Sequence, residues 1–169
     1  MTTDLPSTDN LSPANRTVRF DSLEQEVFLN LWRTYDRLRM LEDELFARFE
    51  LTPQQYNVLR LLKAQHPDPI PTLTLANRLV SRAPDITRML DKLEQRDLIS
   101  RERSAENRRV VHVALTDAGS LLLQNLYEPL NDCHRRQLGH LSEPQLKMLC
   151  SLLRDARHPH EESEGHWKQ

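Results

Sequence analysis

Residues 72–115 constrain the fold most, because their apolar residues recur first with the period of a helix and then with the period of a strand. Residues 72–80 predict a short helix and residues 84–97 a second one, with the turn 81–83 between them. Apolar side chains of the second helix recur at i, i+3, i+4 and i+7, which leaves the opposite face polar and partly basic. This order is typical of a helix-turn-helix, although generic helical hairpins share it.

The segment that follows favours the helix-turn-helix. Residues 98–103 and 110–115 alternate with period two and are rich in β-branched residues, so they predict two strands. The loop between them is polar and carries Arg108 and Arg109. A helix-turn-helix followed by a basic β-hairpin is a winged helix. Such a unit can place one helix in the major groove of DNA and the loop arginines in the adjacent minor groove.

Longer helices are predicted on both sides of this unit. Residues 21–49 carry more apolar surface than one small domain needs, so we expect this helix to take part in a dimer. A capping box at Thr52–Gln55 starts the next helix, and Ser142–Gln145 repeats the device near the C-terminus. Pro129 is expected to kink or interrupt the helix that Thr116 starts.

These segments predict a mainly α fold with a small β-hairpin wing. The predicted architecture is a winged helix-turn-helix flanked by N- and C-terminal dimerisation helices. We divide the chain into a flexible arm at residues 1–20, a winged helix domain with its dimerisation helices at 21–157, and a polar tail at 158–169. The core of the winged helix is expected at residues 51–116.

Composition excludes several classes of protein. A chain of 169 residues corresponds to about one domain. It has only 3 Gly and no Gly-rich phosphate loop, nucleophile–base motif or metal-ligand spacing, so we expect no enzymatic activity, cofactor or metal. No apolar stretch has the length of a membrane helix, and residues 1–15 do not resemble a signal peptide. This predicts a cytoplasmic protein without a membrane partner.

The charge of the chain is unevenly distributed. A net charge of −2 argues by itself against nucleic acid as a partner. Residues 78–109, however, hold 9 basic and 6 acidic side chains, so this segment is positive and the remainder negative. A basic segment of this kind can bind a polyanion locally. The alternative interpretation is a solvated charged surface without a ligand.

Together, the order of elements and the motifs resemble the MarR family of bacterial winged-helix repressors. The resemblance rests on LTPQQYNVLRLL (51–62), LANRLVSRAPDITRMLDKLEQRDLISRE (75–102) and ENRRVVHVALTDAG (106–119), and with the flanking helices it covers residues 21–157. The wing is the most specific part. The family pattern D-x-R-x-x-x-V-x-L-T is similar to the segment formed by Asn107, Arg109, Val113, Leu115 and Thr116, with every spacing kept.

The resemblance implies a homodimer that binds a pseudo-palindromic double-stranded DNA operator and is often released by a small anionic or aromatic effector. Its recognition helix, residues 84–97, and its wing supply the predicted DNA contacts. Asp85 has two interpretations, as a partner of the helix dipole or of a cytosine amino group, and Pro84 is a helix opener before it is a base contact. The predicted DNA-binding residues are Arg82, Pro84, Asp85, Thr87, Arg88, Lys92, Asn107, Arg108 and Arg109.

Two positions depart from the family pattern. Asn107 replaces the aspartate that holds the wing arginine in position in the family, and Asn can still accept a hydrogen bond from a guanidinium but supplies no charge. Asp97 stands where a glycine is common after the recognition helix. Because Asp tolerates a left-handed backbone better than most residues, we expect the turn to survive.

Two further sites are open to interpretation. A ligand pocket, if present, is expected between the first helix and the winged helix, with Trp32, Tyr35 and Tyr56 as walls, although core packing is an alternative role for each. Cys133 precedes a histidine and two arginines that can lower the pKa of a thiol, although a plain thiol on a helix is the favoured interpretation. The alternatives to a DNA-binding repressor are therefore a redox-responsive regulator using Cys133, with Cys150 as the other thiol, and a dimeric interaction module.

Overall fold

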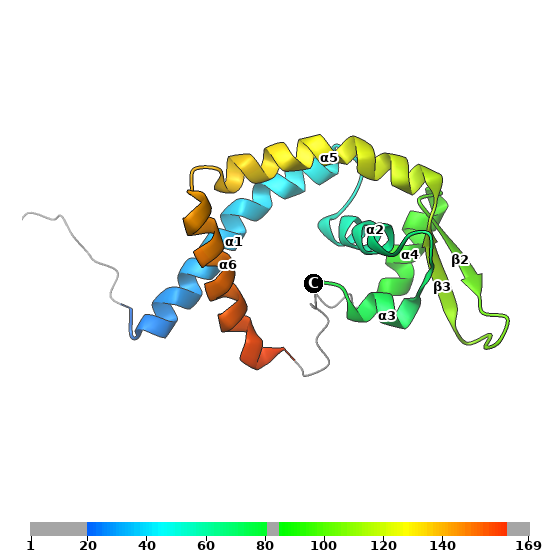
Figure 1. The fold of residues 1–169 in the computed structure, drawn as a ribbon, viewed down its shortest axis with the longest axis horizontal. Helices are drawn as coiled ribbons and strands as arrows, with labels where there is room; N and C mark the ends of the chain where they lie inside the picture. The colour runs from blue at the N-terminus through cyan, green and yellow to red at the C-terminus, as the bar shows by residue number, and fades with distance from the viewer. Residues whose placement is uncertain (1–19, 81–84, 162–169) are drawn as a thin grey trace, which may run out of the picture. The chain divides into compact units, whose positions relative to one another are not determined.

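The computed structural model describes residues 20–80 and 85–161. Within them the chain is mainly helical with a small antiparallel sheet, which confirms the predicted fold class (Figure 1). The elements are α1 (Leu23–Ala47), α2 (Pro53–Gln65), β1 (Ile70–Pro71), α3 (Thr72–Asn77), α4 (Ile86–Gln95), β2 (Ile99–Arg103), β3 (Val111–Leu115), α5 (Asp117–Leu138), α6 (Glu143–Arg157) and the 3-10 turn η1 (His158–His160).

The chain divides into two units within α1, after Asp36. The first unit contains the N-terminal part of α1. The second contains the C-terminal end of α1 and all the later elements, and every contact described below lies inside this second unit. Among the described residues, no helix is long and apolar enough to cross a membrane.

The sheet has the strand order β1-β3-β2. Antiparallel β2 and β3 form the predicted hairpin, with Ile99 opposite Leu115 and Arg101 opposite Val113. A third strand, which the sequence pattern does not predict, forms where Ile70 pairs with Val113, and this gives β1 at the sheet edge. Ile70 is buried, and Pro71 is tolerated because an edge strand does not need every backbone N–H.

The helix starts follow the predicted capping chemistry with one shift. The Gln55 N–H donates to Thr52 Oγ1 over 3.2 Å, and the Thr52 N–H donates to Gln55 Oε1 over 2.9 Å, which completes the predicted capping box. The recognition helix α4 begins at Ile86 rather than at residue 84, because Asp85 caps it by accepting a hydrogen bond from the Arg88 N–H over 3.0 Å. Likewise, α3 ends at Asn77 and not at Val80.

Two helix ends adopt the same left-handed geometry without glycine. Glu50, after α1, has φ 54°, and Asp97, after α4, has φ 55°. The Leu51 N–H donates to the Phe46 carbonyl and the Leu98 N–H to the Leu93 carbonyl, each over 3.0 Å. These are Schellman-type ends, and the turn at Asp97 survives as expected.

Pro129 does not interrupt α5, which runs from Asp117 to Leu138. A proline inside a helix removes one backbone hydrogen bond at a cost of about 3 kcal/mol. Leu126, Leu130 and Cys133 surround Pro129 in the sequence and are all buried, so packing holds the helix together across it. Of the two predicted outcomes, the interruption is therefore wrong, and the kink stays a prediction.

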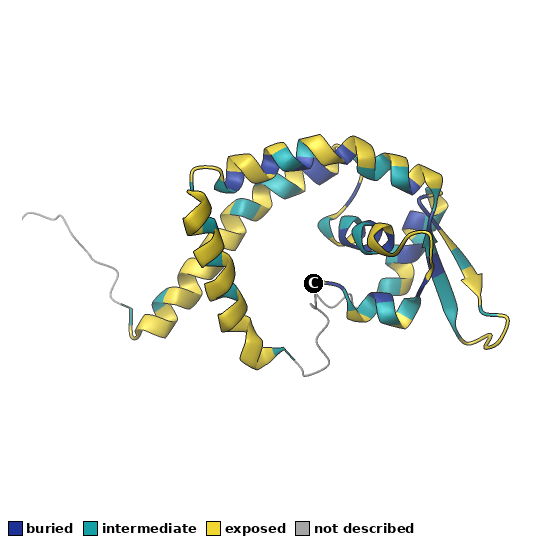
Figure 2. Cartoon of the chain, in the orientation of Figure 1, coloured by how far each residue is buried: buried dark blue, intermediate teal, exposed yellow. Residues whose placement is uncertain are grey.

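The apolar core lies in the winged helix and the two helices that contact it. Leu59, Leu75, Leu93 and Val113 are fully buried there, whereas no residue of α6 is buried (Figure 2). At Gly119 in the first turn of α5, a Cβ atom would lie 2.2 Å from the Leu98 carbonyl oxygen. Only glycine therefore allows α5 to start so close to the segment that follows α4.

Candidate nucleic-acid interface

The recognition helix α4 has one face in the core and one in solvent. Leu90 and Leu93 are buried and Ile86 packs against the same core. Thr87, Arg88 and Lys92 lie on the exposed face, where the sequence places DNA contacts. Packing of the apolar face fixes the rotation of the helix about its axis, so these three polar side chains are directed away from the protein.

Asp85 is exposed, but its carboxylate already has a partner. Its Oδ1 accepts the Arg88 N–H in the first turn of α4. The geometry favours the capping interpretation over a contact to cytosine, because a base would have to share or displace this hydrogen bond. Arg82 and Pro84, the remaining predicted contacts in this segment, lie outside the described residues.

The wing is held by Asn107 through the backbone. Asn107 Oδ1 accepts the backbone N–H of Arg109 over 3.1 Å, while the Asn107 carbonyl accepts the Val110 N–H over 2.8 Å. The Asn107 N–H in turn donates to Ser104 Oγ over 3.3 Å. Asn107 therefore orders the loop that carries Arg109, although the expected partner of its side chain was the Arg109 guanidinium. Both Arg108 and Arg109 are exposed.

Arg101 on β2 joins the wing to the recognition helix, a contact that the sequence analysis did not identify. Its guanidinium donates from Nε to Glu94 over 2.9 Å and from Nη2 to Asp91 over 2.6 Å. The hydrogen bond to Glu94 is the main reason why the pKa of Arg101 is raised. The single charge of Arg101 also offsets part of the negative charge of these two carboxylates on the helix that carries Arg88 and Lys92.

Arg96 makes a second unpredicted link, at the other end of α4. Its Nη1 donates to the Glu50 carbonyl over 2.5 Å and its Nη2 to the Phe49 carbonyl over 3.2 Å. Both acceptors lie just after α1. A basic side chain near a helix C-terminus is a signal in the sequence, but it does not reveal that the carbonyls belong to another helix.

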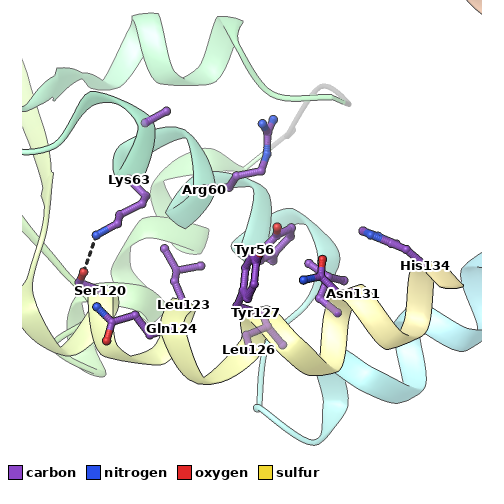
Figure 3. Close-up of a pocket in the computed structure, with 12 residues that line it drawn as sticks. Tyr56, Arg60, Lys63, Ser120, Leu123, Gln124, Leu126, Tyr127, Asn131 and His134 are labelled. Atoms are coloured by element: carbon purple, nitrogen blue, oxygen red, sulfur yellow. Dashed lines mark hydrogen bonds between the residues drawn. The ribbon is translucent and has the colours of Figure 1, made fainter. Parts of the chain in front are cut away.

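A cavity of about 590 Å³ lies between α2 and α5 (Figure 3). Tyr56 and Tyr127 line it, and Arg60 and Lys63 add positive charge. Across it, Lys63 Nζ donates to Ser120 Oγ over 2.8 Å. The remaining lining residues are Ala64, Leu123, Gln124, Leu126, Leu130, Asn131 and His134.

Of the three predicted pocket walls, Tyr56 is the one that lines this cavity. It also stacks on Phe46 at the end of α1, with ring centroids 4.9 Å apart, and burial raises the pKa of its hydroxyl. Trp32 and Tyr35 are exposed side chains of the N-terminal unit. Their role as pocket walls stays a prediction.

Cys133 lies beside a second cavity, of about 640 Å³, between α1 and α5. The thiol is buried, and burial, assisted by Glu42, raises its pKa, with Arg136 opposing the shift. The neighbouring basic residues therefore do not lower this pKa overall, because desolvation outweighs them. Cys150, on α6, is exposed. Within residues 20–80 and 85–161, no cluster of side chains could hold a metal ion.

Comparison with known proteins identifies relatives that regulate transcription. A family model described as MarR family matches residues 51–111. A crystal structure of a MarR transcription factor from Planctomyces limnophilus is 56% identical, with 80% of this chain and 98% of that chain covered and a TM-score of 0.65. The HTH-type transcriptional repressor MdtR of Bacillus subtilis is 27% identical over 75% of this chain and 80% of its own length.

A third comparison concerns the fold. A mutant MarR from E. coli, crystallised in complex with operator DNA, is 21% identical and has a TM-score of 0.70. The match covers 80% of this chain and 99% of that one. At this level of identity the likeness shows the fold alone, and its coverage includes helices that flank the winged helix.

Proposed function

The chain belongs to the MarR family of DNA-binding transcription regulators, and from this premise we propose that it represses transcription as a homodimer on a pseudo-palindromic operator. A small aromatic or anionic effector then relieves the repression. The observation that carries this proposal is the exposed polar face of α4, where Thr87 and Arg88 project from a helix whose other face is buried. A helix held in this way can present directional donors to base edges.

The wing supplies a second, less specific contribution. Arg108 and Arg109 are exposed on a loop that Asn107 orders. Because the minor groove distinguishes mainly A·T from G·C, these arginines act through phosphates and groove potential rather than through base sequence. Lys92, on the exposed face of α4, is also suited to a phosphate.

Exposed apolar side chains support the homodimer. In the single chain, Phe28, Trp32 and Tyr35 on α1 are exposed, and so are Met148 and Leu152 on α6. Large exposed apolar residues at helical spacing are typical of a surface that a partner covers, and α6 has no buried residue in the single chain. A second copy of the chain is the partner proposed here. Two recognition helices then lie about 34–36 Å apart, one turn of DNA, and read symmetric half-sites.

The cavity between α2 and α5 supports an effector. Tyr56 and Tyr127 offer aromatic surface, and Arg60 and Lys63 offer positive charge, so the lining suits a small aromatic acid. A carboxylate that binds Lys63 competes with the Lys63–Ser120 hydrogen bond between the two helices. A redox-responsive regulator using Cys133 is disfavoured, since a buried thiol with a raised pKa is a poor nucleophile.

The proposed function is tested by selecting bound sequences from a random pool of duplex DNA. A repressor of this kind enriches a pseudo-palindrome, and hydroxyl-radical footprinting of the enriched duplex shows protection with dyad symmetry. Sedimentation shows a species of twice 19.9 kDa. Arg88→Ala weakens binding to the enriched duplex more than to unrelated DNA, by about 1–3 kcal/mol for a bidentate base contact. A pool without enrichment favours the dimeric interaction module instead.

A matched pair of wing variants refines this test. Arg109→Ala should weaken binding to the enriched and the unrelated duplex by similar factors. It should also reduce the slope of log K against log salt concentration by about one unit. Asn107→Asp keeps the acceptor for the Arg109 N–H but adds a charge near DNA. If loop order dominates, its affinity stays at or above that of the parent. A clear loss with an unchanged fold means that repulsion by phosphate dominates.

A further inference from the structure

We propose that Arg96 is a positioning residue for sequence-specific DNA binding, which it supports by fastening the C-terminal end of the recognition helix α4 to the end of α1. The proposal rests on the function proposed above. Arg96 follows the last turn of α4 and donates to two main-chain carbonyls, those of Phe49 and Glu50, over 3.2 and 2.5 Å. We call these two hydrogen bonds the Arg96 contact.

The chemistry of the two helix ends explains why an arginine suits this place. The left-handed conformation of Glu50 ends α1, and its carbonyl and that of Phe49 are left free to accept from outside the helix. Arg96 itself lies at the C-cap of α4. One guanidinium therefore compensates the negative ends of two helix dipoles, and its fork of donors reaches both carbonyls at once.

The Arg96 contact adds to the packing of Leu90 and Leu93, and it joins α4 to a part of the chain that the other polar contacts of α4 do not reach. Asp85 closes the N-terminal turn within the helix itself, and Arg101 connects its C-terminal half to β2 through Asp91 and Glu94. Arg96 is the side chain that connects its C-terminal end to α1. Base contacts in the major groove depend on hydrogen-bond direction, whereas phosphate contacts tolerate small rotations of the helix.

Because of this contact, the guanidinium of Arg96 is not available to bind DNA directly. Only 31% of the Arg96 side chain is exposed, and its guanidinium is occupied by the carbonyls. The Glu50 carboxylate lies 3.8 Å away and is itself 85% exposed, so it adds little to the contact. Loss of Arg96 should therefore reduce discrimination between DNA sequences and leave the electrostatic part of binding in place.

The experiment compares the affinities of purified full-length variants for two duplexes, the one that the parent protein enriches from a random pool and a scrambled duplex of equal composition. Arg96→Ala should reduce the ratio of the two affinities by about tenfold, which is near the lower end of the value of one hydrogen bond from a charged donor. The affinity for the scrambled duplex and the salt dependence should not change. Arg96→Lys keeps a cation that can reach one carbonyl, so it should restore part of the ratio.

Three controls accompany these variants. Arg39→Ala removes the same charge from an exposed i,i+4 pair on α1 and should leave the ratio unchanged. Glu50→Gln removes the carboxylate but retains the carbonyl and should also have no effect. Thermal unfolding of every variant establishes that the compared proteins are folded. If Arg96→Ala is unfolded, the comparison is made between Arg96→Lys and the parent.

Several results would overturn the proposal. An unchanged ratio in Arg96→Ala excludes positioning. Equal losses on both duplexes, with a salt slope lower by about one, identify a phosphate contact instead. When both variants fold, an affinity ratio for Arg96→Lys no larger than that for Arg96→Ala means that the contact does not position α4. When only Arg96→Lys folds, the same conclusion follows if it keeps the full affinity ratio of the parent. A parent protein that enriches no sequence refutes the proposed function itself, which is a separate outcome.

Discussion

In the winged-helix core, residues 51–116, apolar side chains at helical spacing point inward, whereas on α6 the same kind of spacing leaves them outside. Leu59 on α2 is 0% exposed, but Leu152 on α6 is 60% exposed. Both helices start at a Ser/Thr-x-x-Gln segment with a proline in the first turn, and both carry leucines at helical spacing. The difference therefore lies in what covers them. The core is complete in one chain, while α6 has an apolar surface that a second copy is proposed to cover.

The largest effect is expected from a truncation in the core. Leu59→Ala should lower the free energy of unfolding by about 2–5 kcal/mol, because it removes buried methyl groups and leaves a cavity. Chemical denaturation measures the change. Leu152→Ala is the matched control, and its effect should depend on protein concentration as the stability of a dimer does. A concentration-independent loss of the same size in Leu152→Ala would contradict the comparison.

A charge on the apolar surface of α6 is expected to act on assembly. Leu152→Asp should raise the dissociation constant of the dimer about a hundredfold, which corresponds to about 3 kcal/mol for placing a carboxylate in an apolar interface. Sedimentation over a dilution series detects the shift toward 19.9 kDa. The helical signal in circular dichroism should persist, since Leu152 is not part of the buried core. An unchanged dimer would show that α6 is not in the interface.

The two capping boxes offer a smaller and cleaner comparison. Thr52→Ala should cost about 1 kcal/mol in the free energy of unfolding, because Thr52 Oγ1 accepts the Gln55 N–H at the start of a buried helix. Ser142→Ala should cost less, since its helix has no buried residue in the single chain. Denaturation at equal protein concentration measures both. Equal costs would mean that α6 contributes to the cooperative core as much as α2 does.

The smallest change concerns the two thiols and leaves the fold intact. At neutral pH, iodoacetamide should modify Cys150 quickly and Cys133 slowly, because a raised pKa leaves less thiolate at any given pH. The rate for Cys133 should rise only at higher pH, while both thiols should react alike in denaturant. Mass spectrometry after short pulses follows the reaction. Equal native rates would restore the redox-responsive alternative.

Local sequence predicted the elements whose structure depends on near neighbours. The Thr52–Gln55 box and the hairpin strands depend on residues a few positions apart, and both form. The start of α4 differs because Asp85 supplies a side-chain acceptor that Pro84 lacks. Interruption at Pro129 was wrong because buried neighbours, which a local pattern does not weigh, hold α5 together.

Long-range contacts were the part that the sequence did not predict. Arg96 reaches carbonyls 46 and 47 residues away, and Ile70 pairs with Val113 on the distant strand β3. The pKa of Cys133 was not predictable from the adjacent residues either, because burial in the fold raises it and outweighs the effect of the adjacent arginines. The exposed residues Thr87, Arg88 and Lys92 lie on the predicted face, and their contact with DNA stays a prediction.

The Arg96 contact also has a consequence for native-state hydrogen exchange. The amides of Leu51 and Leu98 each donate to a carbonyl five residues earlier, at the two helix ends that Arg96 connects. When the contact opens, both ends lose a common support, and the two amides are exposed to solvent in one cooperative event. Although they are far apart in the sequence, they should exchange with deuterium at similar rates. The fraying of one helix is thereby coupled to the fraying of the other.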